Sequence, residues 1–483
     1  MAGMDVALDL WDRLPLDVQD GAVALALLAP GLLAGALACR GLRPWTAARA
    51  LLRRNRGLNL LLAGLMALSV GLGAALTAQE RALREGAARA ADPFDVIVAA
   101  PGDRISLMLA AVYLEPTDAP LLGGEVLARL QADPRAALVA PIAFGDSVGG
   151  APLVGSTAGF VARMGGVAEG RVFETRAEAV VGALSPLAPG ASFTPAHGAA
   201  GAADEHAHEG EAFTVVGRLA PTGSPWDRAV VVPVEAVWDV HGLADGHAPG
   251  AEAEADHAED HAGHDHADHD EQDDHGTHAD HGHEAHDAHD ARARLIGPPF
   301  DPAYFPGTPA FLVSGDTLWA NYALRNDYDR DGAMAFLPGA ELARLHGVLG
   351  DVRRLMSLMA GAAQALVAAG ALAGLAALAR LFAPRLALAR ALGAPRRYTL
   401  AVMWSYAAAL VGAAALLGLP IGWAGAQLAS SLVAERTGVA MEAALGWPEI
   451  RLAAAFFSSA AVLALAPAAL ALRRDPREDL RGR

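Results

Sequence analysis

Lysine is absent from this chain of 483 residues, whose 37 basic residues are all arginine, and cysteine occurs once, at Cys39. Without lysine the chain cannot contain the phosphate-binding loop of an ATPase or a Schiff-base site. With one cysteine it cannot form an internal disulfide, a thiolate zinc site or an iron–sulfur cluster. The zinc-protease signature HExxH is absent too, and we predict no catalytic residues, no required cofactor and no enzymatic activity.

Negative charge is concentrated in one segment. The formal net charge is −17, and residues 247–290 contain 15 acidic residues, no basic residue and 12 of the 17 histidines. The other 439 residues contain 39 acidic and 37 basic residues, a difference of −2. The chain is therefore a nearly neutral, apolar body with one acidic, histidine-rich insert. We expect no nucleic-acid partner, because the arginines do not form a broad cationic surface.

Five segments are apolar enough for transmembrane helices, which need about 20 residues each. The four strongest cover residues 57–79, 355–379, 399–430 and 450–472. The fifth, residues 21–39, contains no charge. A secretory signal would begin with a basic segment, whereas residues 1–20 contain five aspartates and one arginine. We therefore predict an additional N-terminal span at residues 21–39.

The arginines predict the orientation of these spans, because basic loops stay in the cytoplasm. Residues 40–56 contain six arginines, residues 380–398 contain five, and the tail 473–483 contains five. These three segments are predicted to be cytoplasmic. The external segments are then the N-terminal tail 1–20, the region 80–354 and the loop 431–449.

The external region 80–354 is long enough for one or two folded domains. Valine-rich runs bounded by proline and glycine predict strands at residues 95–99, 137–144, 213–219, 229–234 and 309–313. Helical patterns cover residues 124–132 and 317–324, and polar helices at 77–91 and 337–354 continue the adjoining spans. The predicted fold class is an α-helical membrane protein, with four core spans plus one N-terminal span, and a large α+β external domain on a helical stalk.

The insert 247–290 has almost no large apolar residues and is predicted to be disordered. Its histidines are spaced as HxH and HxxH among carboxylates, a pattern that lets neighbouring side chains chelate one transition metal. We predict loosely bound Zn²⁺, Ni²⁺ or Cu²⁺ rather than one site of defined geometry; a solvated linker is the alternative. The predicted ligands are His257, His261, His264, His266, His269, His275, His278, His281, His283, His286 and His289. A weaker polar stretch with His197, His206 and His208 could join them.

Two shorter patterns predict turns. Asp327, Asp329 and Asp331 alternate as in the first half of a calcium loop, but the acidic residue required at its far end is missing near residues 337–339. A solvated turn is therefore the preferred interpretation. Residues 222–227, TGSPWD, predict a turn that enters a strand.

Three motifs resemble the FtsX/MacB-type permeases of ABC transporters, a family that includes MacB, LolC and LolE. Residues 385–397 read RLALARALGAPRR and are similar to the cytoplasmic loop of that family. Residues 467–481 read PAALALRRDPREDLR and are similar to its closing motif, and residues 47–56 resemble the basic elbow helix before its first span. The order of one span, a large external domain and three further spans also agrees.

The resemblance implies a dimeric permease, homodimer or heterodimer, in the bacterial inner membrane, with its large domain in the periplasm and a separate ABC ATPase subunit as partner. Such proteins transmit ATP-driven motion to the external side for efflux, lipoprotein extraction or control of cell-wall hydrolases. Residues 383–397 would form the helix that contacts the ATPase, with coupling residues Arg385, Arg390, Gly393, Arg396 and Arg397. The N-terminal span and the histidine-rich insert depart from the family plan.

Two functions remain open from the sequence. The first is a permease subunit of an ABC transporter for efflux, lipoproteins or metal homeostasis, with membrane lipids around it and a periplasmic metal-binding protein as a further partner. The alternative is a membrane-anchored periplasmic metal sensor or metal chaperone without an ATPase. A co-purifying ATPase subunit would distinguish them.

Overall fold

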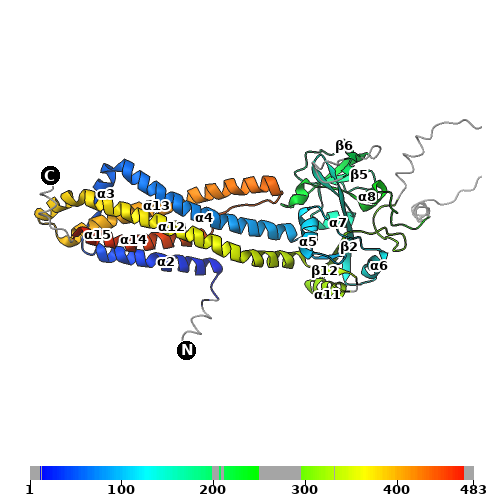
Figure 1. Ribbon diagram of the computed structural model, residues 1–483, viewed down its shortest axis with the longest axis horizontal. Helices are drawn as coiled ribbons and strands as arrows, with labels where there is room; N and C mark the ends of the chain where they lie inside the picture. Colours follow the sequence, from blue (N-terminus) through cyan, green and yellow to red (C-terminus); the bar gives the residue numbers. More distant parts are fainter. Residues whose placement is uncertain are drawn as a thin grey trace, which may run out of the picture. The chain divides into compact units, whose positions relative to one another are not determined.

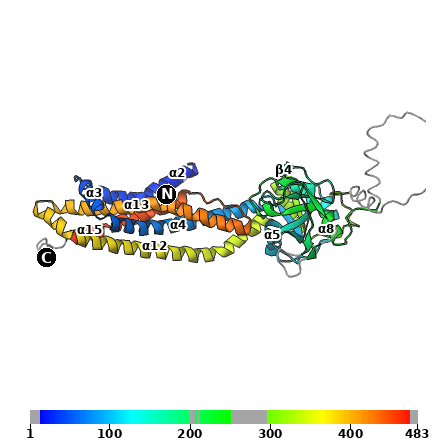
Figure 2. The same ribbon diagram turned by 90° about the horizontal axis from the view of Figure 1, so that it is seen from above.

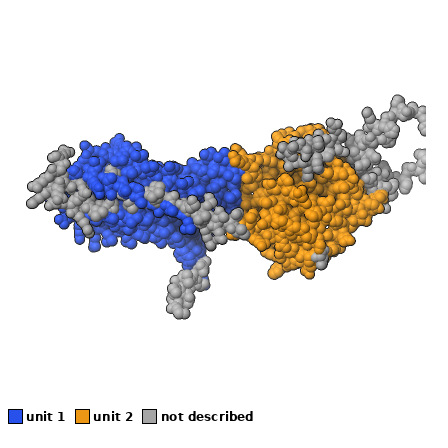
Figure 3. All heavy atoms as spheres, viewed as in Figure 1, with its two compact units in different colours: residues 1–85, 349–433, 441–483 blue, residues 86–348, 434–440 orange. Residues whose placement is uncertain are grey.

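The computed structural model describes residues 11, 13–197, 206–207, 212–249, 295–330 and 332–472. The chain divides into two compact units, drawn in different colours in Figure 3. Unit 1 comprises residues 1–85, 349–433 and 441–483, and unit 2 comprises residues 86–348 and 434–440. Unit 1 is helical, whereas unit 2 contains the β-sheet.

Long apolar helices build unit 1 and run side by side in Figures 1 and 2. They are α2 (Leu16–Ala38), α4 (Arg56–Ala91), α12 (Pro338–Ala391), α13 (Arg396–Thr437) and α14 (Trp447–Leu463), with the shorter α3 (Trp45–Arg54) and α15 (Leu465–Leu472). Among the described residues, α2, α4 and α13 are long and apolar enough to cross a membrane. The chain thus has the helices of a membrane protein.

Each predicted span maps onto one of these helices, except the last, which maps onto two. The predicted segment 355–379 lies inside α12, and the polar stretches 77–91 and 337–354 are helical as expected, in α4 and α12. The segment 450–472 falls on two helices, because α14 ends at Leu463 and α15 begins at Leu465. Pro467 accounts for the interruption, since proline has no N–H to donate to the carbonyl of the residue four positions earlier.

Glycines bring the backbones of α4 and α13 into contact. A Cβ added to Gly71 would lie 3.0 Å from the Gly418 carbonyl oxygen, and one added to Gly422 would lie 2.6 Å from the Gly71 carbonyl oxygen. Small residues of this kind allow helices to pack closely where no hydrophobic effect drives them together, as in a membrane. α4 and α13 therefore form a tightly packed pair.

The N-terminal helix α2 packs against α14. The Gly31 N–H donates to Ser458 Oγ at 2.8 Å, and a Cβ on Gly31 would lie 2.9 Å from the Ser458 Cα. At one end of the pair, Trp447 Nε1 donates to Asp17 Oδ1 at 3.1 Å, and Arg451 forms an ion pair with Asp20. The predicted extra helix is thus an integral part of unit 1.

One mixed sheet dominates unit 2, and its strands run in the order β12-β1-β11-β2-β3-β10-β5-β9-β4. The strands are β1 (Val96–Ala99), β2 (Ala136–Val148), β3 (Ala151–Ser156), β4 (Val167–Gly170), β5 (Glu178–Val181), β9 (Phe213–Leu219), β10 (Val230–Pro233), β11 (Ala310–Gly315) and β12 (Met334–Phe336). Three short strands lie off this path: β6 (Ser192–Phe193) pairs with β9, and β7 (Ala196–His197) pairs with β2 and with β8 (His206–Ala207). The pairs β3–β10 and β5–β9 are parallel. All five predicted strands are present, so the α+β prediction is confirmed.

Helices cover both faces of this sheet. Ile97 belongs to one buried cluster, together with Met108 of α5 (Arg104–Tyr113) and Phe160 of α7 (Ala158–Arg163). Val96 and Val98 belong to the second cluster, which contains residues of α6 (Gly124–Gln131), α8 (Val234–Val240) and α11 (Leu318–Tyr328). Side chains alternate between the faces of a strand, so burial on both faces explains why these strands are unbroken apolar runs.

The glycine contact between α4 and α13 can be tested by two substitutions on the same helix. In Gly422→Ala the new methyl would meet the Gly71 carbonyl, and we expect overpacking to lower the free energy of unfolding by about 1–3 kcal/mol. In Gly425→Ala the Cβ would lie 3.7 Å from the Ala75 Cβ, an ordinary contact. That control should gain helix propensity, at most about 1 kcal/mol. Thermal unfolding in detergent measures both, and equal midpoints would contradict the proposed close contact.

Candidate functional site

The turn between α12 and α13 contains the predicted coupling residues. The Ala394 N–H donates to the Ala389 carbonyl and the Gly393 N–H donates to the Arg390 carbonyl, both at 3.0 Å. This pair of hydrogen bonds is the Schellman arrangement that ends helices. It requires a left-handed residue, and Gly393 has φ +101°. Gly393 thus shapes the turn, and Pro395 precedes the first residue of α13.

Aromatic packing anchors this turn to the helices of unit 1. Phe382 is fully buried near the end of α12, and its ring lies edge-on to the Tyr406 ring of α13, with centroids 5.5 Å apart. The Tyr406 hydroxyl hydrogen-bonds Asn59 Oδ1 of α4, and Asn59 Nδ2 donates to the Leu52 carbonyl of α3 at 2.9 Å. The inner side of the turn is therefore fastened to both α3 and α4.

The outer side of the turn presents arginines and leucines. Arg385, Arg396 and Arg397 are exposed, and Arg390 is half-buried. Leu392 is 82% exposed and Leu388 is 56% exposed. All five predicted coupling residues therefore lie within the last two turns of α12, the connecting turn and the first turn of α13. This combination of cationic and apolar side chains is typical of a surface that another protein covers.

The predicted metal ligands His257 to His289 lie outside the described residues. Of the weaker stretch, His197 in β7 and His206 in β8 are register partners, and Asp146 of β2 is the register partner of His197. His208 also lies outside the described residues. The structure brings these two histidine positions opposite each other beside β2, which their spacing in the sequence did not indicate.

Arg176 joins the two ends of the histidine-rich insert. Its side chain is 7% exposed and forms ion pairs with Asp239 Oδ2 of α8 at 2.8 Å and with Asp245 Oδ2 at 2.9 Å. The same guanidinium donates to the Leu295 carbonyl at 3.0 Å. Burial alone would raise the pKa of Asp245, but hydrogen bonds from Arg176 and from the His247 backbone outweigh it and hold that pKa below its usual value. One buried arginine thus connects residues on both sides of the insert.

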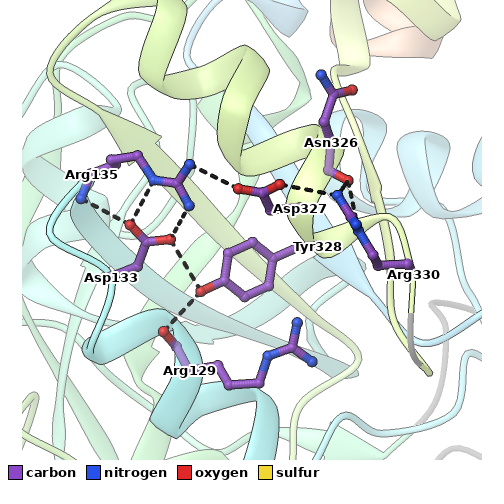
Figure 4. A network of polar contacts seen from close by, with 7 residues as sticks. All are labelled: Arg129, Asp133, Arg135, Asn326, Asp327, Tyr328 and Arg330. Atoms are coloured by element: carbon purple, nitrogen blue, oxygen red, sulfur yellow. Dashed lines mark hydrogen bonds and ion pairs between the residues drawn. The ribbon is translucent and has the colours of Figure 1, made fainter.

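Two of the alternating aspartates pair with arginines: Asp327 with Arg135 and Arg330 (Figure 4), and Asp329 with Arg104. Asp331 lies outside the described residues. Arg135 binds Asp133 through two nitrogens, at 2.9 and 2.7 Å, and Asp327 Oδ2 at 2.8 Å. Asp329 accepts from Arg104 at 2.7 Å. The hydrogen bonds from Arg135 lower the pKa of Asp133. Arginines pair with the carboxylates that a calcium loop would use for the ion. The predicted turn begins later than expected, because Asp327 lies in the last turn of α11 and Asp329 caps that helix.

The turn at residues 222–228 is held by a buried tryptophan and a buried aspartate. Trp226 is fully buried, its Nε1 donates to the Ala111 carbonyl at 3.1 Å, and its ring lies 4.9 Å from the Phe160 ring. Asp227 accepts from the Thr222 N–H and hydroxyl, both at 2.7 Å. The predicted turn into a strand is confirmed, because the 3₁₀ helix η1 (Pro225–Arg228) leads into β10.

The same turn binds the end of α13, within unit 2. Arg228 donates to the Glu435 carbonyl at 2.9 Å, and the Ala440 N–H donates to the Gly223 carbonyl at 2.9 Å. Gly438 has φ +71°, a conformation that favours glycine, and a Cβ added to it would lie 3.1 Å from the Pro225 Cα. No local pattern predicts this attachment, since Arg228 and Glu435 are separated by 207 positions.

Breaking the Arg176 cluster should destabilise unit 2. In Arg176→Met, Asp239 and Asp245 lose their buried partner. We expect the free energy of unfolding to fall by about 3 kcal/mol, the low end of the range for a broken buried ion pair. The low end applies because both carboxylates are partly exposed. The pKa of Asp245 is lower in the folded protein than its value of about 3.9 in the unfolded chain, so the Arg176 pair stabilises the fold at pH values above about 3.9. That stabilisation is lost as the pH falls through the folded pKa. The difference between the proteins should therefore narrow below about pH 4.

The measurement is the midpoint of thermal unfolding of the full chain between pH 7 and pH 3. Arg344→Met is the matched control, because that side chain is 75% exposed and its Glu341 pair is 3.8 Å long. We expect the control to change stability by less than about 0.5 kcal/mol at every pH. Equal losses in the two variants would contradict the structural role of Arg176.

Comparison with known proteins adds no relative. No protein-family model matches the chain, and no curated protein matches it either. The resemblance to FtsX/MacB-type permeases therefore depends on the motifs at residues 47–56, 385–397 and 467–481. Of these, residues 473–481 lie outside the described part of the chain.

Proposed function

We propose that this chain is the permease subunit of an ABC transporter, which transmits motion from a separate ATPase in the cytoplasm to an external domain formed by unit 2. The subunit would work as a homodimer or a heterodimer in the bacterial inner membrane. It would contribute no catalytic residue of its own, because ATP hydrolysis belongs to the partner. Efflux, lipoprotein handling and metal homeostasis are the processes that such a subunit could serve.

The observation that carries this proposal is the pair of attachments at the two ends of α13. The arginine-rich turn, anchored by Phe382 and Tyr406, immediately precedes its first residue, Arg396. Its last residues belong to unit 2, where the Glu435 carbonyl accepts from Arg228. A displacement of the arginine-rich turn would therefore act on the first residues of α13. The last residues of α13 would pass that displacement to the 222–228 turn.

Helix length supports the same proposal. At 1.5 Å per residue, α4 with 36 residues, α13 with 42 and α12 with 54 are about 54, 63 and 81 Å long. The hydrocarbon core of a bilayer is about 30 Å thick, so each helix is far longer than a span requires. α4 and α12 also continue without a break from the residues of unit 1 into those of unit 2. Continuous helices suit the stalk that we propose for transmitting motion.

The chemistry of the turn fits a protein partner rather than lipid alone. Five arginines and no acidic residue lie in residues 380–398, and Leu392 is the most exposed leucine of that turn. We propose that Leu388 and Leu392 enter an apolar groove of the ATPase, whose acidic rim pairs with Arg385, Arg396 and Arg397. Rim charges of this kind guide association, while the central apolar contacts contribute most of the affinity.

The histidine-rich insert is the reason to include metal homeostasis. Its predicted ligands would collect Zn²⁺, Ni²⁺ or Cu²⁺ outside the membrane, and a periplasmic metal-binding protein would be a suitable donor. The Arg176 cluster favours a defined attachment of this insert, because residues before and after it meet at one side chain. A metal sensor or metal chaperone without an ATPase remains the second candidate, and the ATPase experiment separates the two.

The test reverses the charge of the coupling turn. We expect the double variant Arg396→Glu, Arg397→Glu to insert into the membrane. The rate of ATP hydrolysis in the complex that co-purifies with it from the native membrane should be at least tenfold lower than with the wild-type chain. The reason is that two favourable pairs become repulsive contacts with the same acidic surface. ATP hydrolysis by the purified complex, normalised to the amount of this chain, is the measurement.

The matched control is Arg40→Glu, Arg43→Glu, the same charge reversal at two exposed arginines of the predicted cytoplasmic segment 40–56. It should retain ATP hydrolysis, which separates the effect of the turn from a general loss of positive charge in the cytoplasm. Hydrolysis that survives in the coupling variant would argue against our assignment of the turn. Reproducible absence of any ATPase from the wild-type preparation would favour the metal sensor or chaperone.

A further inference from the structure

We propose that Glu235 and His247 form a binding site for one divalent transition-metal ion at the base of the histidine-rich insert. Glu235 lies on α8, and His247 lies three residues before the part of the insert that is outside the described residues. Neither residue is among the eleven predicted ligands from His257 to His289. The site is independent of the proposed coupling to an ATPase.

The two side chains face each other in the interior without a hydrogen bond between them. Glu235 is 0% exposed and His247 is 9% exposed. The distance from His247 Nε2 to Glu235 Oε1 is 3.6 Å, too long for a hydrogen bond. Among the described residues, His247 Nε2 and Glu235 Oε2 have no hydrogen-bond partner. Buried polar atoms that remain unsatisfied cost free energy, so this pair requires something between its members.

A metal ion fits the separation of these atoms. Zinc binds histidine nitrogen and carboxylate oxygen at about 2.0–2.2 Å, so two such ligands at a tetrahedral angle lie about 3.4 Å apart. The observed 3.6 Å needs only a small adjustment. The Gly297 N–H donates to Glu235 Oε1 at 2.5 Å, the kind of second hydrogen bond that orients a ligating carboxylate. Glu235 Oε1 keeps a second lone pair for the ion, and Glu235 Oε2, which has no hydrogen-bond partner among the described residues, is free to bind it as well.

The surroundings of the pair are anionic and accessible. Glu235, Asp239 and Asp245 contribute three carboxylates, and Arg176, the cation that pairs with two of them, contributes one positive charge. A dication would compensate the remaining difference. His247 also lines a cavity of about 400 Å³ together with residues 295–301, through which an ion and its water ligands could reach the histidine.

The number of protein ligands defines the kind of site. In the described part of the chain, no group of three or more His, Cys, Asp or Glu side chains is arranged to hold a metal ion. Glu235 and His247 therefore supply two ligands, and water completes the coordination of the ion. An imidazole paired with a carboxylate selects Zn²⁺, Ni²⁺ or Cu²⁺ over Mg²⁺ and Ca²⁺, which prefer oxygen ligands only.

The position of the site gives it a role distinct from that of the insert. The Gly297 N–H, which follows the insert, and His247, the first residue of the insert, both meet Glu235 of α8. An ion held here would tie the two ends of the insert to α8, which follows β10 and the 222–228 turn directly in the chain. Metal captured by the insert could thereby pass to this site and change how the two ends of the insert are attached to α8.

The test uses the full chain in detergent, with the eleven histidines from His257 to His289 replaced by asparagine so that the insert no longer binds metal. Zn²⁺ is titrated in competition with a chromophoric chelator. We expect one zinc per chain in this background, and we expect His247→Gln and Glu235→Gln each to weaken its affinity at least tenfold. Glu235→Gln retains the Oε1 acceptor for the Gly297 N–H, so it removes the charge while keeping the local fold.

His346→Gln is the matched control, because His346 is a half-buried histidine of α12 in the same unit. It should leave zinc affinity unchanged, and the zinc-induced rise in the midpoint of thermal unfolding should survive in it and disappear in the two site variants. The proposal is overturned if the background binds no zinc, or if either site variant folds and binds zinc with unchanged affinity. Because no ATPase takes part, the result does not depend on the proposed transport function.

Discussion

Backbone contact between α4 and α13 is possible only because Gly71, Gly418 and Gly422 carry no side chain, and the arrangement of unit 1 depends on that contact. In a bilayer, lipid is as apolar as the helix surfaces, so packing requires close approach rather than expulsion of water. The same principle operates where Gly31 of α2 meets Ser458 of α14. An alanine-, leucine- and glycine-rich sequence is therefore suited to long helices that pack through their backbones.

Because α13 is packed against α4, the contacts at the two ends of α13 are connected through one constrained helix. Close contact with α4 along its middle limits how α13 can move sideways, while Phe382 and Tyr406 fasten the turn before it. At the other end, Arg228 donates to the Glu435 carbonyl in the last turn of α13, and the Gly223 carbonyl accepts from the Ala440 N–H just after the helix. The proposed transmission of motion needs such a helix, and among the described helices α13 has both attachments.

Unit 2 shows how a folded domain can carry a long, highly charged insert. Its sheet is covered on both faces, so its core does not depend on the insert. The insert leaves after α8 and returns before β11, and Arg176 holds residues from both sides of it. Because the ends are close together in space, a long insertion adds little conformational cost to the rest of the domain. Acidic groups at this base create the environment in which a cation could be bound.

Local patterns in the sequence determined the secondary structure of both units. Valine-rich runs became β9 and β10, and the apolar segments became helices, because strand and helix formation depends on residues close together in the chain. The position of Gly393 in a cationic turn was also readable, since helix ends have local signals. Where Pro467 interrupts a predicted span, the signal was present and the length of the apolar run outweighed it.

Only the tertiary structure decided which distant residues meet. Arg176 pairs with Asp239 and the Leu295 carbonyl across 63 and 119 positions, and Glu235 binds the Gly297 N–H across 62. No spacing rule connects such residues, because the fold of the sheet and the return of the chain after the insert bring them together. The sequence therefore determined the membrane helices, the α+β domain and the location of charge. The attachment of α13, the arginine cluster and the Glu235–His247 pair exist only once the chain has folded.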